Sequence, residues 1–192
     1  YALSTTRIGG HSAAPYESFN MGCHVGDEEG AVAANRALLV NALPGGSSIS
    51  WLSQVHGTAV VEAAPCASPP PADAQWSRTP GAVCTVMTAD CLPVLLCSVD
   101  GDVVAAAHAG WRGLLAGLGP AIGPAAFEVG KEVRAAYLSS AAPSQAKKVA
   151  ACFAPSDRPG HYLADLYTLA RLRLDDMGLS GVFGGDLCTY SD

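Results

Sequence analysis

Apolar positions along the chain recur with two spacings, and these predict both strands and helices. Runs rich in β-branched and aliphatic residues predict strands at positions 1–10, 49–56, 58–63, 82–88, 92–99 and 102–107. Helical spacing covers positions 31–43, 128–138 and 166–177, and we expect Gly178 to cap the last of these helices. Several strands follow one another directly, with helices before and after them. This order predicts an α+β or layered α/β fold.

The clearest local signal is Asp100-Gly101, which lies between two apolar runs. A type I′ hairpin turn needs positive φ at both central residues, and Asp-Gly is a favoured pair for it. With this turn, His108 faces Pro93, and Cys91 lies on the same face as His108 as its diagonal neighbour. Such neighbours are about 7–8 Å apart, close enough to share a metal ion. Both faces of the hairpin are mostly apolar, so we expect a central strand pair that is covered on both sides.

Composition limits the class of protein. The chain has 192 residues, of which 49% are hydrophobic and 15% charged, and this predicts one domain with ample core. The net charge is −6 and no basic cluster exceeds Lys147-Lys148, which argues against nucleic-acid binding. The most apolar stretch, positions 83–99, is interrupted by Asp90 and Pro93 and is shorter than the ~20 residues of a membrane-spanning helix.

Cysteine usage indicates a reducing compartment. Seven cysteines are scattered along the chain, and none of them form a CxxC pair. An odd, dispersed set in a chain of this size is typical of reduced thiols. No signal peptide is visible, and because the chain starts at Tyr1 rather than Met, we expect a few residues to precede it. The cytoplasm is therefore the expected compartment, and positions 63–71 are expected to form an extended surface loop within one domain.

Three residues are candidate metal ligands. His108 follows an apolar strand and shares a face with Cys91, which follows Asp90 at a break between strands, and His56 ends a strand before Gly57. Two imidazoles and a thiolate can hold zinc and leave a fourth position for water or substrate. A cuprous ion accepts similar ligands. Alternatively, His108 activates Cys91 as a nucleophile, and in either case Asp90 is available as a general acid or base.

The remaining histidines and the glycine-rich turns carry weaker signals. His11, His24 and His161 lie in polar, loop-like surroundings, where structural or surface roles are the usual ones. Gly9-Gly10 and positions 119–124 offer backbone amides that can bind anions. Neither matches a P-loop or a dinucleotide fingerprint, so the sequence gives no support for a nucleoside triphosphate or NAD site.

A series of motifs resembles a known bacterial family, in the same order and over almost the whole chain. They include Gln54-Val55-His56-Gly57, Ala89-Asp90-Cys91, His108-Ala109-Gly110-Trp111-Arg112-Gly113, Gly119-Pro120-Ala121-Ile122-Gly123 and Cys188-Thr189-Tyr190. The first three in this order are highly specific. The family was first named polyphenol oxidoreductase (multicopper laccase) and later purine nucleoside phosphorylase.

The resemblance implies a single domain over positions 1–192, folded as a layered α/β/β/α sandwich. It implies that His56, Cys91 and His108 hold a metal ion, expected to be zinc with copper as the alternative. It also implies phosphorolysis of adenosine, inosine and methylthioadenosine, together with deamination of adenosine. Editing of peptidoglycan precursors and oxidation of phenols have been attached to other members. A multicopper oxidase needs many more histidines than five, which places phenol oxidation lower.

These activities suggest roles for further side chains. For deamination, a metal at the triad lowers the pKa of a bound water toward ~7, and Asp90 moves the proton. For phosphorolysis, phosphate attacks the ribose C1′, with Arg7 or Arg112 as its contacts and with Asn20 and Gln54 bonding base or sugar. A metal-binding partner protein without turnover is the alternative from another class. No feature of the sequence indicates an oligomeric state.

The chain departs from the family in two places. Similar proteins carry a longer stretch, about a helix and a strand, where this chain passes from Gly117 directly to Leu118. Their tails also continue beyond Tyr190. The run after Gly110 is too short for an ordinary crossover between strands. We therefore expect residues of the substrate pocket to be missing between positions 117 and 118 and at the end.

Overall fold

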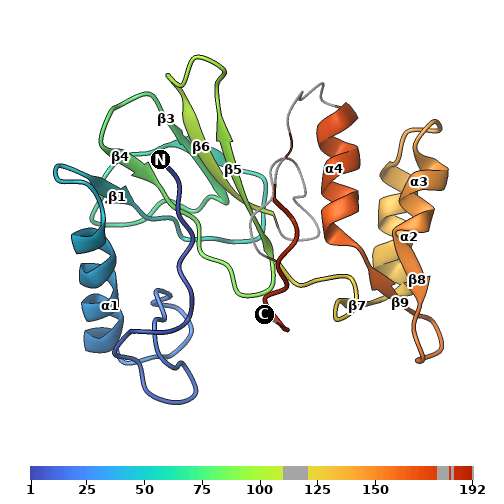
Figure 1. Ribbon diagram of the computed structural model, residues 1–192, viewed down its shortest axis with the longest axis horizontal. Coiled ribbons are helices and arrows are strands. Elements are labelled where there is room, and N and C mark those ends of the chain that lie inside the picture. The colour runs from blue at the N-terminus through green and yellow to red at the C-terminus, as the bar shows by residue number, and fades with distance from the viewer. Residues whose placement is uncertain (110–120, 177–181, 183, 192) are drawn as a thin grey trace.

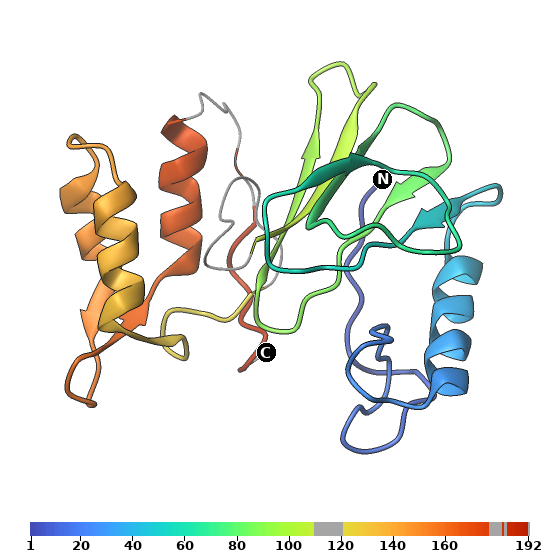
Figure 2. The same ribbon diagram turned by 180° about the vertical axis from the view of Figure 1, so that it is seen from behind.

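A computed structural model of the protein describes residues 1–109, 121–176, 182 and 184–191. Its elements in chain order are α1 (Glu29–Ala42), β1 (Ser48–Ser50), β2 (Val60–Glu62), β3 (Ala74–Ser77), β4 (Ala82–Cys84), β5 (Leu92–Cys97), β6 (Val104–Ala109), β7 (Glu128–Gly130), α2 (Lys131–Ser140), α3 (Ala146–Ala151), β8 (Phe153–Pro155), β9 (His161–Ala164) and α4 (Leu166–Asp176). Helix α1 lies at one end of the molecule, and α2, α3 and α4 gather at the other (Figure 1, Figure 2). The predicted α+β class is confirmed.

The described strands form three sheets. Parallel strands β1 and β4 make a pair, and a four-stranded sheet has the order β2-β3-β6-β5. In this larger sheet β2 and β3 are parallel, whereas β6 runs antiparallel to both β3 and β5. The third sheet, with the order β7-β9-β8, is antiparallel and lies with the C-terminal helices. None of the helices in the described part of the chain is long and apolar enough to cross a membrane.

The predicted register of the β5–β6 hairpin is confirmed, because Pro93 pairs with His108. The predicted type I′ turn is wrong. Of the two central residues only Gly101 has a positive φ, 73°. The N–H of Ser98 donates to the carbonyl of Val103 at 2.9 Å, and the N–H of Gly101 donates back to Ser98 at 3.0 Å. The loop is thus longer than predicted but centred on the same residues, so the register is unchanged.

One face of the hairpin is buried, whereas the opposite face is partly exposed. Leu92 and Val94 are fully buried and pack in one core with residues of α2 and α4. On the opposite face Leu95 is 45% exposed. Within the described sheet β5 is an edge strand and β6 is central. The expectation of a central pair buried on both sides is therefore wrong for β5, and it holds for β6 near His108, which is buried.

The first ten residues form no strand, contrary to the prediction. The backbone groups of this segment and of His11, which follows it, bond to a neighbouring loop and to a side chain of α1. The carbonyl of Arg7 accepts from the N–H groups of Ser18 and Phe19 at 2.7 and 2.9 Å. Asn35, fully buried on α1, accepts from the N–H of His11 at 2.7 Å. These partners replace a strand neighbour, because each backbone group needs only one good bond.

Two of the three predicted helices agree closely with α1 and α4. The third begins late, since Glu128–Gly130 forms strand β7 before α2 starts. Strands β3, β8 and β9 and helix α3 were not predicted. Gly178 and the junction between positions 117 and 118 lie outside the described residues.

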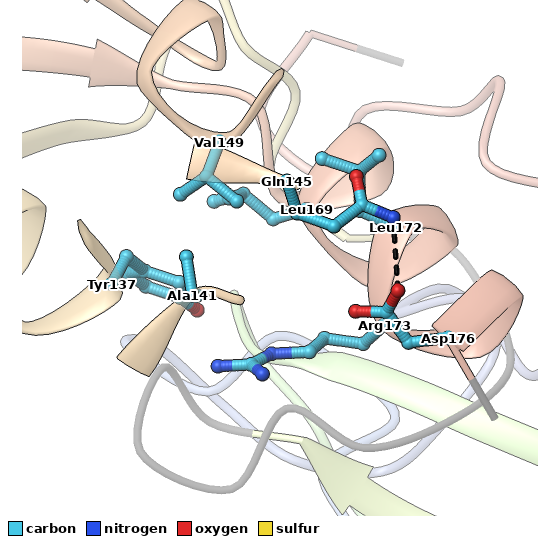
Figure 3. Close-up of a pocket in the computed structure, with 8 residues that line it drawn as sticks. All are labelled: Tyr137, Ala141, Gln145, Val149, Leu169, Leu172, Arg173 and Asp176. Carbon is cyan, nitrogen blue, oxygen red and sulfur yellow. Dashed lines mark hydrogen bonds between the residues drawn. The ribbon is translucent and has the colours of Figure 1, made fainter. Parts of the chain in front are cut away.

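The three C-terminal helices enclose a cavity of about 10 Å³ (Figure 3). The amide of Gln145 donates to Asp176 at 2.9 Å across it. Tyr137 also lines this cavity, and its buried hydroxyl has no hydrogen-bond partner among the described residues. The hydroxyl of Tyr167 differs, because it accepts from the N–H of Ala121 at 2.6 Å and donates to the carbonyl of Leu187 at 2.5 Å.

These two buried tyrosines give a matched test of the fold. We expect Tyr167→Phe to lower the free energy of unfolding by about 1–3 kcal/mol, because it strands a buried N–H. Tyr137→Phe removes a hydroxyl without a partner and should leave that free energy unchanged within about 0.5 kcal/mol. Chemical denaturation of both variants measures the difference. An equal loss in both would contradict this account of the core.

Candidate metal centre

The structure brings together the three residues that the sequence singled out as ligands. The ligand atoms of His56, Cys91 and His108 all lie within 4.8 Å of one another. The two imidazole rings meet edge to face, with their centroids 4.6 Å apart and an angle of 85° between their planes. His56 is exposed, Cys91 half-buried and His108 buried, so the group has a closed side and an open side.

Two of the three candidate ligands are placed by the hairpin. His108 lies on β6, and Cys91 comes directly before β5. Because side chains alternate along a strand, positions 91, 93, 106 and 108 share one face in this register. The thiol and the imidazole therefore meet as the sequence predicted. His56 comes from a different segment, the loop between β1 and β2.

Asp73, a residue that the sequence did not single out, joins His56 to His108. It lies directly before β3, and its Oδ1 accepts from the ring Nδ1 of His108 at 2.8 Å. The same oxygen accepts from the backbone N–H of His56 at 2.9 Å. Its Oδ2 accepts from the N–H groups of Val55 at 3.2 Å and Gly57 at 2.7 Å. The side chain is 2% exposed.

These hydrogen bonds fix the charge of Asp73. Burial alone would raise the pKa of this carboxyl, but the hydrogen bonds from His108 and from the three loop amides outweigh burial and hold the pKa below its ordinary value. A carboxylate can only accept, so Nδ1 of His108 must carry the proton. The lone pair of its Nε2 is then available to a metal ion.

The loop around His56 has an unusual backbone. His56 has φ = 58°, the left-handed region that non-glycine residues seldom occupy. Such a conformation costs of order 1 kcal/mol and persists only where neighbouring contacts impose it. Here the three successive amides bonded to Asp73 impose it. The strain places the His56 ring against His108.

Cys91 is a neutral thiol in the absence of a metal. Burial, and after it the neighbouring charge of Asp90, raises the pKa of Cys91 to about 11. This disfavours a Cys–His nucleophile pair at neutral pH, because the thiolate is the nucleophile. A metal ion deprotonates a coordinating thiol outright. Two imidazoles and one thiol with converging ligand atoms therefore fit zinc or a cuprous ion.

The candidate substrate residues make hydrogen bonds outside the triad. Gln54 uses both ends of its amide on the backbone of Met87, each at 2.7 Å. Asn20 bonds the carbonyl of Gly22 and the carboxylate of Asp27 within its own loop. Arg7 is exposed, and its Nε donates to the carbonyl of Glu17 at 3.0 Å. Arg112 lies outside the described residues.

Asp90 and the second glycine-rich turn lie near one another. Asp90 is exposed, and its carbonyl accepts from the N–H of Ile122 at 3.4 Å. The amide of Gly123, a candidate anion contact, donates instead to the Sγ of Cys188 at 3.1 Å. Hydrogen bonds from Ser191 and from this amide lower the pKa of Cys188 to about 7. The other histidines, His11, His24 and His161, lie outside the triad.

An α+β chain that presents two imidazoles and a thiol at one end of a sheet belongs to the class of candidate metalloproteins. The family model described as multi-copper polyphenol oxidoreductase laccase matches residues 1–118 and 114–192. This chain belongs to that family.

Relatives and solved structures agree with this assignment. The chain is similar to a purine nucleoside phosphorylase of Pseudomonas aeruginosa, with 49% identity over 100% of this chain and 84% of the relative. It is 50% identical to the purine nucleoside phosphorylase YfiH of Escherichia coli, with the same two coverages of 100% and 84%. A crystal structure of a Neisseria meningitidis protein superposes with a TM-score of 0.86 and 43% identity, covering 96% of this chain and 81% of that one.

The triad predicts a tight metal site in the described part of the chain. We expect the metal-stripped protein to bind zinc at this site, and Cys91→Ala or His108→Ala to weaken binding by more than 100-fold. Loss of a ligand should exceed the 10–100-fold cost of losing an outer hydrogen-bond partner. Competition with a chromophoric chelator measures the affinity. His24→Ala, at an exposed histidine outside the triad, is the matched control, and equal weakening there would argue against this site.

Proposed function

We propose that this protein is a metal-dependent purine nucleoside phosphorylase that acts on adenosine, inosine and methylthioadenosine. The observation that carries the proposal is the convergence of His56, Cys91 and His108 in a chain about 50% identical to relatives that bear this name. Zinc is the proposed metal, with copper as the alternative. The proposed partners are small molecules, a purine nucleoside and phosphate.

The open side of the triad is where a substrate would enter. His56 and Asp90 are exposed, whereas His108 is buried behind them. A zinc ion held by the triad would supply Lewis acidity and lower the pKa of a bound water to about 7. The chain itself contributes a carboxylate, Asp90, beside Cys91. We propose this group for accepting or returning a proton during the reaction.

In phosphorolysis an oxygen of phosphate bonds to the ribose C1′ while the bond from C1′ to the purine nitrogen breaks. The base leaves with the bonding electrons and takes up a proton, giving ribose 1-phosphate and free base. Phosphate needs a cationic partner, for which we propose Arg7 and Arg112. The Nε bond of Arg7 to Glu17 steadies its guanidinium and leaves further N–H groups for an anion.

Deamination of adenosine is the second proposed activity at this site. A water oxygen bonds to C6 of the purine, the exocyclic nitrogen leaves as ammonia, and a proton must pass from the attacking water to this nitrogen. Asp90 is proposed for that transfer, because it is exposed and lies next to the ligand Cys91. Asn20 and Gln54 are proposed to act on base or sugar, either directly or by shaping the loops that they hold.

Two other activities are compatible with the same ligands. The family description supports a copper-dependent phenol oxidase. Against it stands the small number of histidines, since the chain has five and only His56 and His108 belong to the triad. A hydrolase that edits peptidoglycan precursors would keep the site and change the substrate. We propose a cytoplasmic location on the strength of the cysteines, none of which forms a disulfide among the described residues.

The test is chromatography of zinc-loaded protein incubated with adenosine, with and without phosphate. Phosphorolysis predicts adenine that appears only with phosphate, and deamination predicts inosine that appears without it. We expect Cys91→Ala to lower both rates by at least about 100-fold through loss of the metal. Inosine and methylthioadenosine are then compared as substrates.

The control variant is Cys23→Ala, which removes an exposed thiol outside the triad and should retain full activity. A parallel assay follows phenol oxidation by the copper-loaded protein. Zinc-loaded protein that turns over no nucleoside would refute the proposal. Phenol oxidation abolished by Cys91→Ala would then support the oxidase instead.

A further inference from the structure

The carboxylate of Asp73 touches two of the three ligand residues. It accepts from the ring of His108 and from the backbone N–H of His56, and it also binds the amides on either side of His56. The carbonyl of Asp73 accepts from the N–H of His108 at 2.6 Å as well. The residue is thus bonded to His108 through both its side chain and its backbone.

The two carboxylate oxygens have different partners. Oδ2 is held by two backbone amides, those of Val55 and Gly57, which can only donate. Oδ1 is held by one backbone amide, that of His56, and by an imidazole nitrogen. An imidazole can change from donor to acceptor by moving its proton to the other nitrogen, whereas a backbone amide cannot. The tautomer of His108 therefore depends on the atom at the Oδ1 position.

We propose that Asp73 is a positioning residue of the metal centre, which keeps the proton of His108 on Nδ1 and thereby keeps Nε2 open to the metal. The same carboxylate holds His56 in the left-handed conformation that turns its ring toward His108. The proposal rests on the metal site of the proposed function and assigns to it a residue outside the triad.

The substitution Asp73→Asn separates this role from simple support of the loop. If the Asn oxygen takes the Oδ1 position, its NH₂ group opposes two amide N–H groups, those of Val55 and Gly57. If the oxygen takes the Oδ2 position, the NH₂ opposes only the amide of His56, provided that His108 accepts through Nδ1. The second arrangement leaves one N–H group opposed by the NH₂, whereas the first leaves two. Asp73→Asn should therefore move the proton of His108 to Nε2, the atom that would bind the metal.

The first experiment is ¹⁵N NMR of the histidine rings in the metal-free protein, at a pH where the rings are neutral. His108→Gln identifies the signals of His108 by their loss. We expect the Nδ1–H tautomer in the native chain and the Nε2–H tautomer in Asp73→Asn. An Nε2–H tautomer in the native chain would overturn the proposal, and this arm does not require that Asp73→Asn folds.

The second experiment measures zinc affinity and the visible spectrum of the cobalt-loaded protein. Asp73→Asn should bind zinc 10–100-fold more weakly, the range found for outer hydrogen-bond partners of metal ligands. The matched control is Asp165→Asn, the same change at a carboxylate that accepts from the N–H of Thr168 at the start of α4. That control should keep the native affinity, the native cobalt spectrum and the native tautomer.

The outcomes separate this proposal from the proposed function. A native tautomer together with native zinc affinity in folded Asp73→Asn would overturn the role of Asp73, whatever the enzyme does. Absence of nucleoside turnover, with the tautomer and affinity changes as expected, would refute the phosphorylase and leave the role of Asp73 intact. Weak zinc binding with an unchanged tautomer would also overturn it, because support of the loop alone gives that result.

Discussion

The buried carboxylate of Asp73, directly before β3, accepts hydrogen bonds from three loop amides and one imidazole. A buried carboxylate is costly unless its oxygens are bonded, so these four contacts must form together. They join β3, β6 and the loop after β1, segments that are separated in sequence. The cost of burying one charge thus fixes how the loop of His56 lies on the sheet, and the candidate metal centre depends on that placement.

The four-stranded sheet positions the other residues of the site. Strand β6 pairs with both β3 and β5. The backbone hydrogen bonds between these strands therefore fix the positions of His108 on β6 and of Asp73 and Cys91, which directly precede β3 and β5. His56 is the one candidate ligand of the triad that does not lie on or beside a paired strand, and its backbone is in the left-handed region. Rigid placement of two ligands and imposed strain at the third fit a site that keeps its shape without metal. Leu92 and Val94, the fully buried residues of β5, anchor this end of the sheet to the core.

The sequence predicted what depends on local pattern. The register of the hairpin follows from apolar runs around Asp100-Gly101, and it brought Cys91 and His108 together correctly. Strand β3 escaped prediction because its buried positions, Gln75 and Ser77, are polar, so no apolar alternation marks it. Asp73 precedes that strand and bonds a residue 35 positions away. The N-terminal segment was assigned wrongly as a strand, since nothing local reveals that Asn35 on α1 binds its backbone.

Gln54, a candidate substrate residue, also orders the backbone near the triad through its side chain. Its amide bonds the backbone of Met87 in both directions, which fixes the segment leading to His56 against the segment leading to Cys91. Each end of the amide makes one bond to this backbone, so the second N–H stays available to a nucleoside, and Gln54 is proposed to act on substrate directly or through the segments that it holds. The polar side chains of Asp73 and Gln54 order the candidate metal ligands, whereas exposed side chains remain available to a substrate. His56, the exposed member of the triad, and Asp90, the exposed sequence neighbour of Cys91, mark the open side on which the proposed substrate would enter.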